Sequence, residues 1–257
     1  MSPLIKVSDL AMGWDQTVLL QDASFEVKRG SVFVILGGSG CGKSTLLRYL
    51  IGLERPTSGT IEIDGVTGTQ LGVGRPEFGV MFQSGALLGS MTVGANLALQ
   101  LTEWTSLPTE AVNAIVRAKL RLVGLHDAED LMPSELSGGM RKRVAIARAM
   151  VLEPSLIFLD EPSAGLDPVS SFELDELILS LNQGLGLTVV MVSHDLQSIF
   201  AIADSCIMLD KQSQSIIARG DPRELRDTAS DPRVSAFFNR RAAPLPAPRP
   251  SAPEVNP

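Results

Sequence analysis

The first third of the chain alternates short apolar runs with polar turns. Apolar positions at 4–7 and 24–27 predict two strands, and the run Val32–Leu36, apolar throughout, is typical of a strand buried on both faces. Leucine and isoleucine then recur at helical spacing over 44–53, and alternation over 60–64 predicts another strand. The predicted order is strand, loop, helix, strand.

From about Thr92 to Leu152 the apolar residues recur with a period near 3.6, interrupted at Pro108 and Pro133, which predicts a helical subdomain. Strands and helices alternate again after it. The expected elements are a strand at 156–160, a helix near 169–181, a strand at 188–193, a helix at 195–203 and a strand at 205–209. This alternation predicts an α/β fold with a mostly parallel sheet covered by helices.

The composition supports one sizeable core. The 257 residues are 44% hydrophobic with a mean hydropathy of +0.19, and the formal net charge of −7 disfavours nucleic-acid binding. No apolar run approaches the roughly 18 residues of a membrane span, and no secretory signal is visible at the N-terminus. Since two cysteines make no disulfide framework, we expect a cytosolic, reduced protein.

The C-terminal end differs in composition. From Arg240 onward six of eighteen residues are proline, so we expect this tail to be extended or disordered in isolation. The chain therefore divides into a domain at 1–228, with the helical subdomain inserted at about 84–152, and an extension at 229–257.

The segment Gly37–Ser44 fits the phosphate-loop pattern G-x-x-x-x-G-K-[ST] and lies between the buried strand and the first helix. Glycines let backbone N–H groups wrap a phosphate, the helix N-terminus adds partial positive charge, Lys43 supplies a cation, and Ser44 can ligate Mg²⁺. The sequence therefore predicts binding of ATP and Mg²⁺. The residues expected to bind ATP here are Gly37, Gly38, Ser39, Gly40, Cys41, Gly42, Lys43, Ser44 and Thr45.

Cys41 lies inside this loop, where the helix N-terminus and Lys43 should favour its thiolate. No partner cysteine or general base is evident nearby, so we favour a role as a small filler residue.

The apolar run Leu156–Leu159 ends in two carboxylates, as expected of a central strand that delivers acids to the carboxyl edge of a sheet. We expect Asp160 to hold Mg²⁺ through water, and Glu161 to orient and deprotonate an attacking water.

At Leu136–Met140 (LSGGM) the sequence resembles the ATP-binding-cassette (ABC) ATPases, whose signature is LSGGQ. The resemblance covers about residues 4 to 228. Gln83 resembles the glutamine of the family's Q-loop, Ser163–Asp167 its D-loop, and His194 its switch histidine. Trp14 stands where the family keeps an aromatic that stacks on adenine, although an ordinary core aromatic is the alternative.

The resemblance implies a P-loop NTPase core with an N-terminal antiparallel β part and an inserted helical subdomain, which is the ABC ATPase fold. It implies catalytic roles for Glu161, His194 and Gln83. It also implies a homodimer, since one phosphate loop and one signature occur per chain. The further roles implied are Mg²⁺ ligation by Ser44, Gln83 and Asp160, and closure over the partner's ATP by Ser137, Gly138 and Gly139.

Met140 replaces the family's glutamine. The segment Leu136–Arg148 (LSGGMRKRVAIAR), together with Phe82–Leu88, resembles the ATPases of Mla and Mce lipid transporters. That similarity implies a peripheral subunit on the cytoplasmic face of the inner membrane, energising phospholipid transport between membranes. The implied partners are an integral-membrane permease, an MCE-domain protein and a small STAS-type protein. Apolar residues in 85–101 could receive a permease helix or simply pack the subdomain.

Other classes of cassette fit less well. A DNA-acting cassette needs a long coiled-coil insertion, and a translation-factor cassette carries two cassettes in one chain. A non-hydrolysing scaffold would lack Glu161 or His194. A cell-division cassette, which signals through a membrane partner without transport, stays open, because its ATPase core would look nearly the same.

Overall fold

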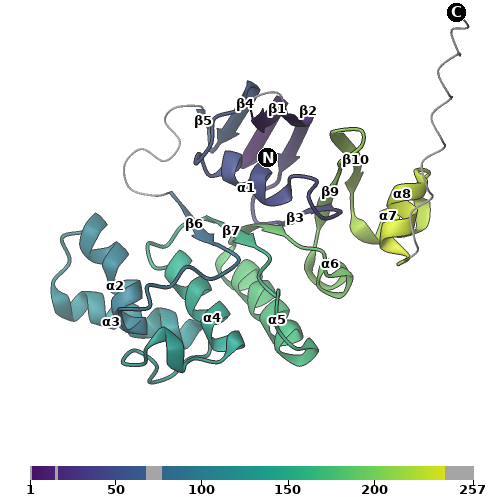
Figure 1. Ribbon diagram of the computed structural model, residues 1–257. Coiled ribbons are helices and arrows are strands. Elements are labelled where there is room, and N and C mark those ends of the chain that lie inside the picture. The colour runs from purple at the N-terminus through teal and green to yellow at the C-terminus, as the bar shows by residue number, and fades with distance from the viewer. Residues whose placement is uncertain (1, 15–16, 68–76, 241–257) are drawn as a thin grey trace, which may run out of the picture.

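The computed structural model describes residues 2–14, 17–67 and 77–240. It contains two sheets, a cluster of helices on one side and two short C-terminal helices on the other (Figure 1). None of the helices in these ranges is both long and apolar enough to cross a bilayer.

The N-terminal sheet has four strands in the order β2-β1-β4-β5, and all neighbouring strands are antiparallel. Its strands are β1 (Ile5–Trp14), β2 (Thr17–Val27), β4 (Ser58–Ile63) and β5 (Val66–Thr67). This confirms the expected antiparallel part.

The second sheet has six strands in the order β10-β9-β3-β8-β7-β6. They are β3 (Val32–Gly37), β6 (Phe78–Met81), β7 (Leu156–Asp160), β8 (Thr188–Val192), β9 (Ser205–Asp210) and β10 (Ser215–Gly220). Every pairing is parallel except that of β9 with β10. The carboxyl ends of β3, β7 and β8 therefore meet at one edge.

Helices cover this sheet and extend beyond it. They are α1 (Lys43–Leu50), α2 (Val93–Trp104), α3 (Thr109–Leu122), α4 (Gly138–Ala149), α5 (Pro168–Leu185), α6 (Leu196–Ile202), α7 (Pro222–Thr228) and α8 (Pro232–Phe238). A 3₁₀ turn, Pro133–Glu135, precedes α4. The group α2–α4 stands apart from the N-terminal sheet (Figure 1), which confirms the expected helical insertion in the ABC ATPase fold.

The core consists of two apolar clusters, one on each face of the six-stranded sheet. Alternate residues of β3 divide between them: Val32 and Leu36 belong to the larger cluster, and Phe33 and Ile35 to the other. Each such buried side chain contributes about 1.5–3 kcal/mol relative to exposure. Burial on both faces explains why the strand is apolar at consecutive positions.

The elements β10, α7 and α8 were not predicted from the sequence. Both helices begin with the same local signal, an aspartate that caps the first turn followed by proline at the first helical position, in Asp221-Pro222 and Asp231-Pro232. Phe238 of α8 is 3% exposed and belongs to the larger cluster, so the chain stays packed beyond residue 228. The tail from 241 lies outside the described residues.

A buried carboxylate lies where α5 packs on α6. Asp175 is 5% exposed and its Oδ2 accepts a hydrogen bond of 2.6 Å from Ser198 Oγ, while its Oδ1 has no partner among the described residues. Burial raises the pKa of Asp175 to about 6, with a further upward contribution from the charges of Asp195 and Glu176. The ionised form is therefore disfavoured in the folded state.

We predict that Asp175→Asn stabilises the protein at pH 8 but not at pH 4. A folded-state pKa above the unfolded value means that the wild type loses stability as pH rises through about 4 to 6, and the neutral amide avoids this loss. The expected gain at pH 8 is about 2–3 kcal/mol, measured by urea unfolding at both pH values. Glu103→Gln, at an exposed carboxylate on α2, is the control, and an equal effect of Asp175→Asn at the two pH values would contradict the assignment.

Candidate nucleotide-binding site

The loop between β3 and α1 turns tightly through glycines. Gly37, Gly40 and Gly42 have φ values of 145°, 71° and 98°, which side chains rarely adopt. A Cβ on Gly37 would lie 2.5 Å from Cys41 Sγ and 2.6 Å from the carbonyl of Leu209. The glycine at this position is therefore required by both conformation and space.

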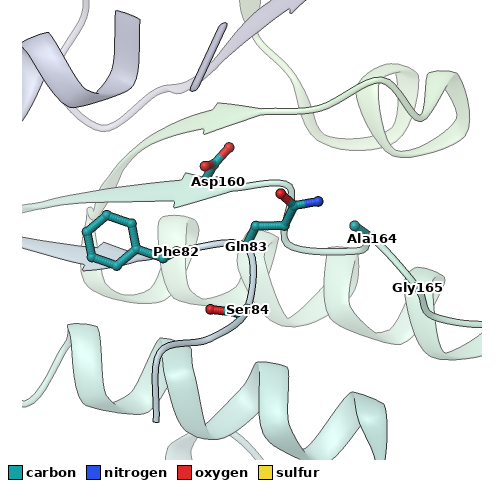
Figure 2. Close-up of a pocket in the computed structure, with 6 residues that line it drawn as sticks. All are labelled: Phe82, Gln83, Ser84, Asp160, Ala164 and Gly165. Atoms are coloured by element: carbon teal, nitrogen blue, oxygen red, sulfur yellow. The ribbon is translucent and has the colours of Figure 1, made fainter. Parts of the chain in front are cut away.

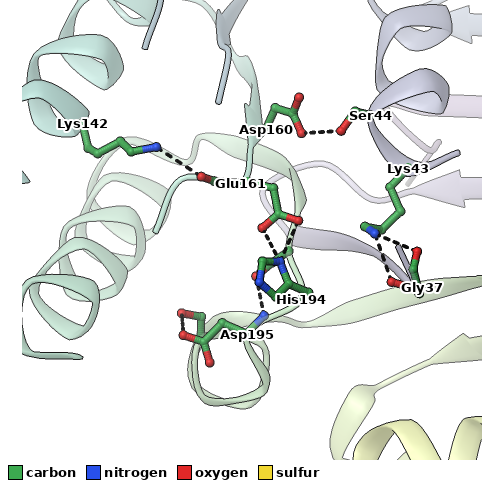
Figure 3. Close-up of polar contacts among 11 residues, drawn as sticks. Gly37, Lys43, Ser44, Lys142, Asp160, Glu161, His194 and Asp195 are labelled. Carbon is green, nitrogen blue, oxygen red and sulfur yellow. Dashed lines mark hydrogen bonds and ion pairs between the residues drawn. The ribbon is translucent and has the colours of Figure 1, made fainter. Parts of the chain in front are cut away.

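The outer side of the loop is open. Gly38, Ser39 and Gly40 are exposed, and a Cβ on Gly38 would meet nothing within 4 Å. Gly42 caps α1 without a side-chain hydrogen bond, so the first N–H groups of the helix point toward this opening. Lys43 Nζ donates to the carbonyls of Gly37 (3.0 Å) and Gly38 (3.1 Å), which places its charge against the loop (Figure 3).

Cys41 lies under this loop. Its side chain is 2% exposed, and burial raises the pKa of the thiol, with Lys43 acting in the opposite direction. The expectation of a favoured thiolate was therefore wrong, because desolvation outweighs the nearby cation. The role of a small filler agrees with this packing.

Two oxygen groups meet beside the loop. Ser44 Oγ donates a hydrogen bond of 2.9 Å to Asp160 Oδ1, which joins α1 to the carboxyl end of β7. Burial raises the pKa of Asp160, and the hydrogen bond from Ser44 partly offsets this. A hydroxyl and a carboxylate are ligands that suit Mg²⁺, which takes few protein ligands and completes its shell with water and phosphate. The residues present fit that ion.

Glu161 and His194 face each other across the same edge. Glu161 is 9% exposed, and its two carboxylate oxygens lie 2.9 and 2.8 Å from Nδ1 of His194 (Figure 3). A carboxylate oxygen accepts, so this contact is a hydrogen bond in the tautomer that carries its proton on Nδ1. Glu161 has a φ of 50°, a left-handed conformation that is costly for a residue other than glycine.

Gln83 lies close to Asp160. Both residues line a hollow of about 580 Å³, together with Phe82, Ser84, Ala164 and Gly165. In Figure 2 the Gln83 amide and the Asp160 carboxylate approach the hollow from different segments. The structure therefore brings Gln83 together with Asp160.

The signature residues lie apart from the phosphate loop of the same chain. Ser137 caps α4 by accepting a hydrogen bond of 3.2 Å from the Met140 N–H, and Gly138 and Gly139 form the first turn. The 310 Å³ hollow that contains Ser137 and Gly139 also holds Ser170, and none of residues 37–45 lines it. The signature and the phosphate loop of one chain thus lie at different sites.

The structure says less about two other predicted ATP-binding residues, Thr45 and Trp14. Thr45 lies in the first turn of α1. Trp14 ends β1, but its side chain is outside the described part of the chain. No group of three or more His, Cys, Asp or Glu side chains suited to a metal occurs in the described ranges, so any Mg²⁺ site depends on mixed oxygen ligands.

Lys142 is a further residue of this region that was not predicted from the sequence. It is 8% exposed, and its Nζ donates to the carbonyls of Gln83 (2.7 Å) and Glu161 (3.3 Å). The available signal was helical spacing, which places Lys142 on the same face of α4 as Ala145 and Ile146, both buried.

A family model described as "ABC transporter" matches residues 20–164, more than half of the chain. The chain is 41% identical to the intermembrane phospholipid transport system ATP-binding protein MlaF of Escherichia coli over 242 residues, covering 92% of this chain and 88% of that protein. It is 40% identical to the probable ribonucleotide transport ATP-binding protein mkl of Mycobacterium tuberculosis over 247 residues, covering 94% and 68%.

Solved structures agree with the fold. The chain superposes on cbiO1 of Clostridium perfringens, part of an ABC transporter complex, with a TM-score of 0.80, 30% identity and coverage of 88% and 92%. It superposes on a bacterial ABC transporter cassette solved as a dimer with a TM-score of 0.75, 28% identity and coverage of 84% and 98%. The phosphate loop, the acidic end of β7 and these similarities lead to one conclusion: the chain belongs to the ABC transporter ATP-binding proteins and is an ABC-type ATPase.

Proposed function

We propose that this chain hydrolyses ATP at the edge formed by β3, β7 and β8 and thereby energises phospholipid transport between membranes. The observation that carries the catalytic part is the convergence of Ser44 with Asp160, and of Glu161 with His194, beside the phosphate loop. Strands distant in sequence deliver these groups to one edge, which is where open α/β sheets bind ligands.

ATP binds through the phosphate loop in this proposal. Backbone N–H groups of Gly38–Gly42 and the start of α1 surround the β-phosphate, and Lys43 exchanges its bonds to loop carbonyls for phosphate oxygens. The groups that would hold Mg²⁺ are Ser44, Asp160 and the Gln83 amide oxygen. When bound, the ion neutralises charge on the β- and γ-phosphates.

Glu161 acts as the general base. Its carboxylate orients a water in line with the γ-phosphorus and accepts a proton as the water oxygen bonds to phosphorus and the bond to the ADP oxygen breaks. The His194 Nδ1–H holds that carboxylate in place, and the rest of the exposed ring is available to the γ-phosphate. A positioned base of this kind contributes about 10²- to 10⁴-fold in rate.

Dimerisation completes the site in this proposal. Ser137, Gly138 and Gly139 lie apart from the phosphate loop of their own chain, and the start of α4 offers N–H donors for a γ-phosphate. A second copy can bring that helix start over the ATP. The dimeric cassette to which this fold is similar supports the arrangement.

The lipid cargo is proposed from similarity. MlaF is named for intermembrane phospholipid transport, whereas mkl is named for ribonucleotide transport. We favour phospholipid because the LSGGM signature and Phe82–Leu88 are similar to those of Mla and Mce ATPases. The partners would be a permease, an MCE-domain protein and a STAS-type protein, with this chain peripheral on the cytoplasmic face of the inner membrane. The cell-division type is the alternative.

We also propose that the ATPase domain spans 1–228, with the helical insertion at about 84–152, and that 229–257 is an extension. The group α2–α4 falls inside the proposed insertion. Helix α8 packs on α7 and on the core, so the proposed extension begins with a folded segment.

We predict that Glu161→Gln binds ATP but hydrolyses it at least about 100-fold more slowly, because the amide keeps the shape and lacks the base. Lys43→Ala should lose hydrolysis and also bind ATP more weakly. Phosphate release and binding of a fluorescent ATP analogue separate the two variants. Turnover near the wild-type rate in Glu161→Gln would overturn the catalytic assignment.

We predict that the same Glu161→Gln protein forms a dimer in MgATP that Ser137→Arg cannot form. Slow hydrolysis preserves the ATP that joins the two copies, and a bulky cation at the start of α4 would occupy the space of the partner's phosphate. Light scattering with and without MgATP measures the mass. Equal association of the two variants would contradict the shared site.

We predict ATP-dependent movement of phospholipid by the membrane complex that this chain copurifies with. The complex is reconstituted in vesicles that contain a fluorescent phospholipid, with Lys43→Ala as the inactive control. Uptake of a labelled ribonucleotide tests the alternative cargo in the same vesicles. Hydrolysis without movement of either molecule would favour the cell-division type.

A further inference from the structure

The general base proposed above has an unusual backbone. Glu161 directly follows β7 with a φ of 50°. Its N–H donates to the Val192 carbonyl at 3.0 Å, and its own carbonyl accepts from the Ala164 N–H at 3.2 Å. A left-handed conformation persists at a non-glycine residue only when surrounding contacts enforce it. These contacts determine where the carboxylate points.

A third contact comes from another part of the fold. Lys142 Nζ, on α4, donates to the carbonyl of Glu161 at 3.3 Å and to the carbonyl of Gln83 at 2.7 Å. Figure 3 shows the lysine reaching the main chain of Glu161 from one side while the carboxylate meets His194 on the other. One ammonium group thus joins the main chain of two residues of the site.

The charge of Lys142 is costly to bury. Desolvation lowers the pKa of Lys142, and the charges of Glu161 and Asp160 act in the opposite direction. An apolar side chain on this face of α4 would avoid the cost, since its neighbours Ala145 and Ile146 are fully buried. The two carbonyls therefore account for a cation here better than core packing does.

A second cation on α4 offers a comparison, because it also binds the loop after Gln83. Arg148, also on α4, donates to the carbonyls of Gly85 (3.1 Å) and Ala86 (2.5 Å). Burial lowers its pKa as well. Both cations hold the same loop, but Lys142 alone of the two also contacts Glu161. Comparing variants of Lys142 and Arg148 therefore distinguishes an effect on the loop after Gln83 from an effect on Glu161.

We propose that Lys142 is a positioning residue that joins the main chain of Gln83 to that of Glu161 and so keeps the general base in its left-handed, productive conformation. This rests on the proposed function, in which Glu161 is that base. A shift of the main chain at Gln83 is transmitted through one side chain to the atom that sets the direction of the carboxylate. The position of the loop at Gln83 is thereby coupled to the orientation of the Glu161 carboxylate within one subunit.

The first test compares Lys142→Met with Arg148→Met in the full chain. Met keeps the length and apolar stem of the lysine and removes the donor. We expect kcat for ATP to fall about tenfold to a hundredfold in Lys142→Met, with KM and the affinity for a fluorescent ATP analogue within about twofold of wild type. Arg148→Met should keep kcat within about threefold, and Lys142→Arg should recover most of the turnover.

The second test measures hydrogen exchange and does not depend on turnover. In Lys142→Met the Ala164 N–H, bonded to the carbonyl of Glu161, should exchange about tenfold faster in peptides that cover 160–166, while strands β3 and β8 keep their protection. Arg148→Met should leave 160–166 unchanged and raise exchange in 84–88. If Lys142→Met does not fold, Lys142→Leu, which also removes the donor, takes its place in both tests.

The outcomes separate this inference from the proposed function. Full turnover in Glu161→Gln overturns the proposed function. An inactive Glu161→Gln together with Lys142→Met at wild-type kcat overturns only the role of Lys142. Parallel loss of kcat, ATP affinity and protection throughout the fold would make Lys142 a structural residue and would also overturn the inference.

Discussion

The six-stranded sheet is covered on both faces, and this constraint decides where polar chemistry can occur. β3, β7 and β8 are buried along their whole length, so a charged side chain within them would lose its hydration without a partner. Polar groups are therefore confined to the ends of the strands. Since these strands are parallel, their carboxyl ends gather Gly37, Asp160 and His194 at one edge although more than 150 residues separate the first from the last.

The same constraint sets the electrostatics of the edge. Asp160 and Glu161 are each 9% exposed, so they are partly desolvated and need specific partners. Ser44 serves Asp160, and His194 serves Glu161. Lys142, on α4, adds a cation that binds the main-chain carbonyls of Gln83 and Glu161 rather than the carboxylates. The Asp160 carboxylate thus faces Ser44 at the start of α1, where a bound cation would offset its charge.

Sequence patterns predicted the central strands β3, β7 and β8 because burial on both faces leaves a continuous apolar run. The predicted bounds of β7, 156–160, are those observed. They predicted the edge residues because strand ends and phosphate-loop glycines are local signals. They did not predict that Glu161 pairs with His194, since nothing local fixes the direction of a side chain 33 positions away. The filler role of Cys41 agrees with its packing, but its expected thiolate was wrong for a related reason: the nearby cation is visible in sequence, whereas the burial that outweighs it is not. The short helices α7 and α8 were missed despite clear Asp-Pro starts.

Helix α4 connects the two halves of the mechanism. Its N-terminus carries Ser137, proposed to reach the partner's nucleotide, and its first two turns carry Lys142, which reaches Glu161 of its own chain. A helix is stiff over this length, so a displacement at its start cannot be absorbed before it reaches Lys142. Because the lysine bonds are to main-chain carbonyls, such a displacement acts on the conformation of Glu161 and not on its charge. Closure of one subunit's α4 around the partner's nucleotide would then align Glu161 beside that subunit's own nucleotide. This gives a physical reason for the two sites of a dimer to hydrolyse ATP together rather than independently.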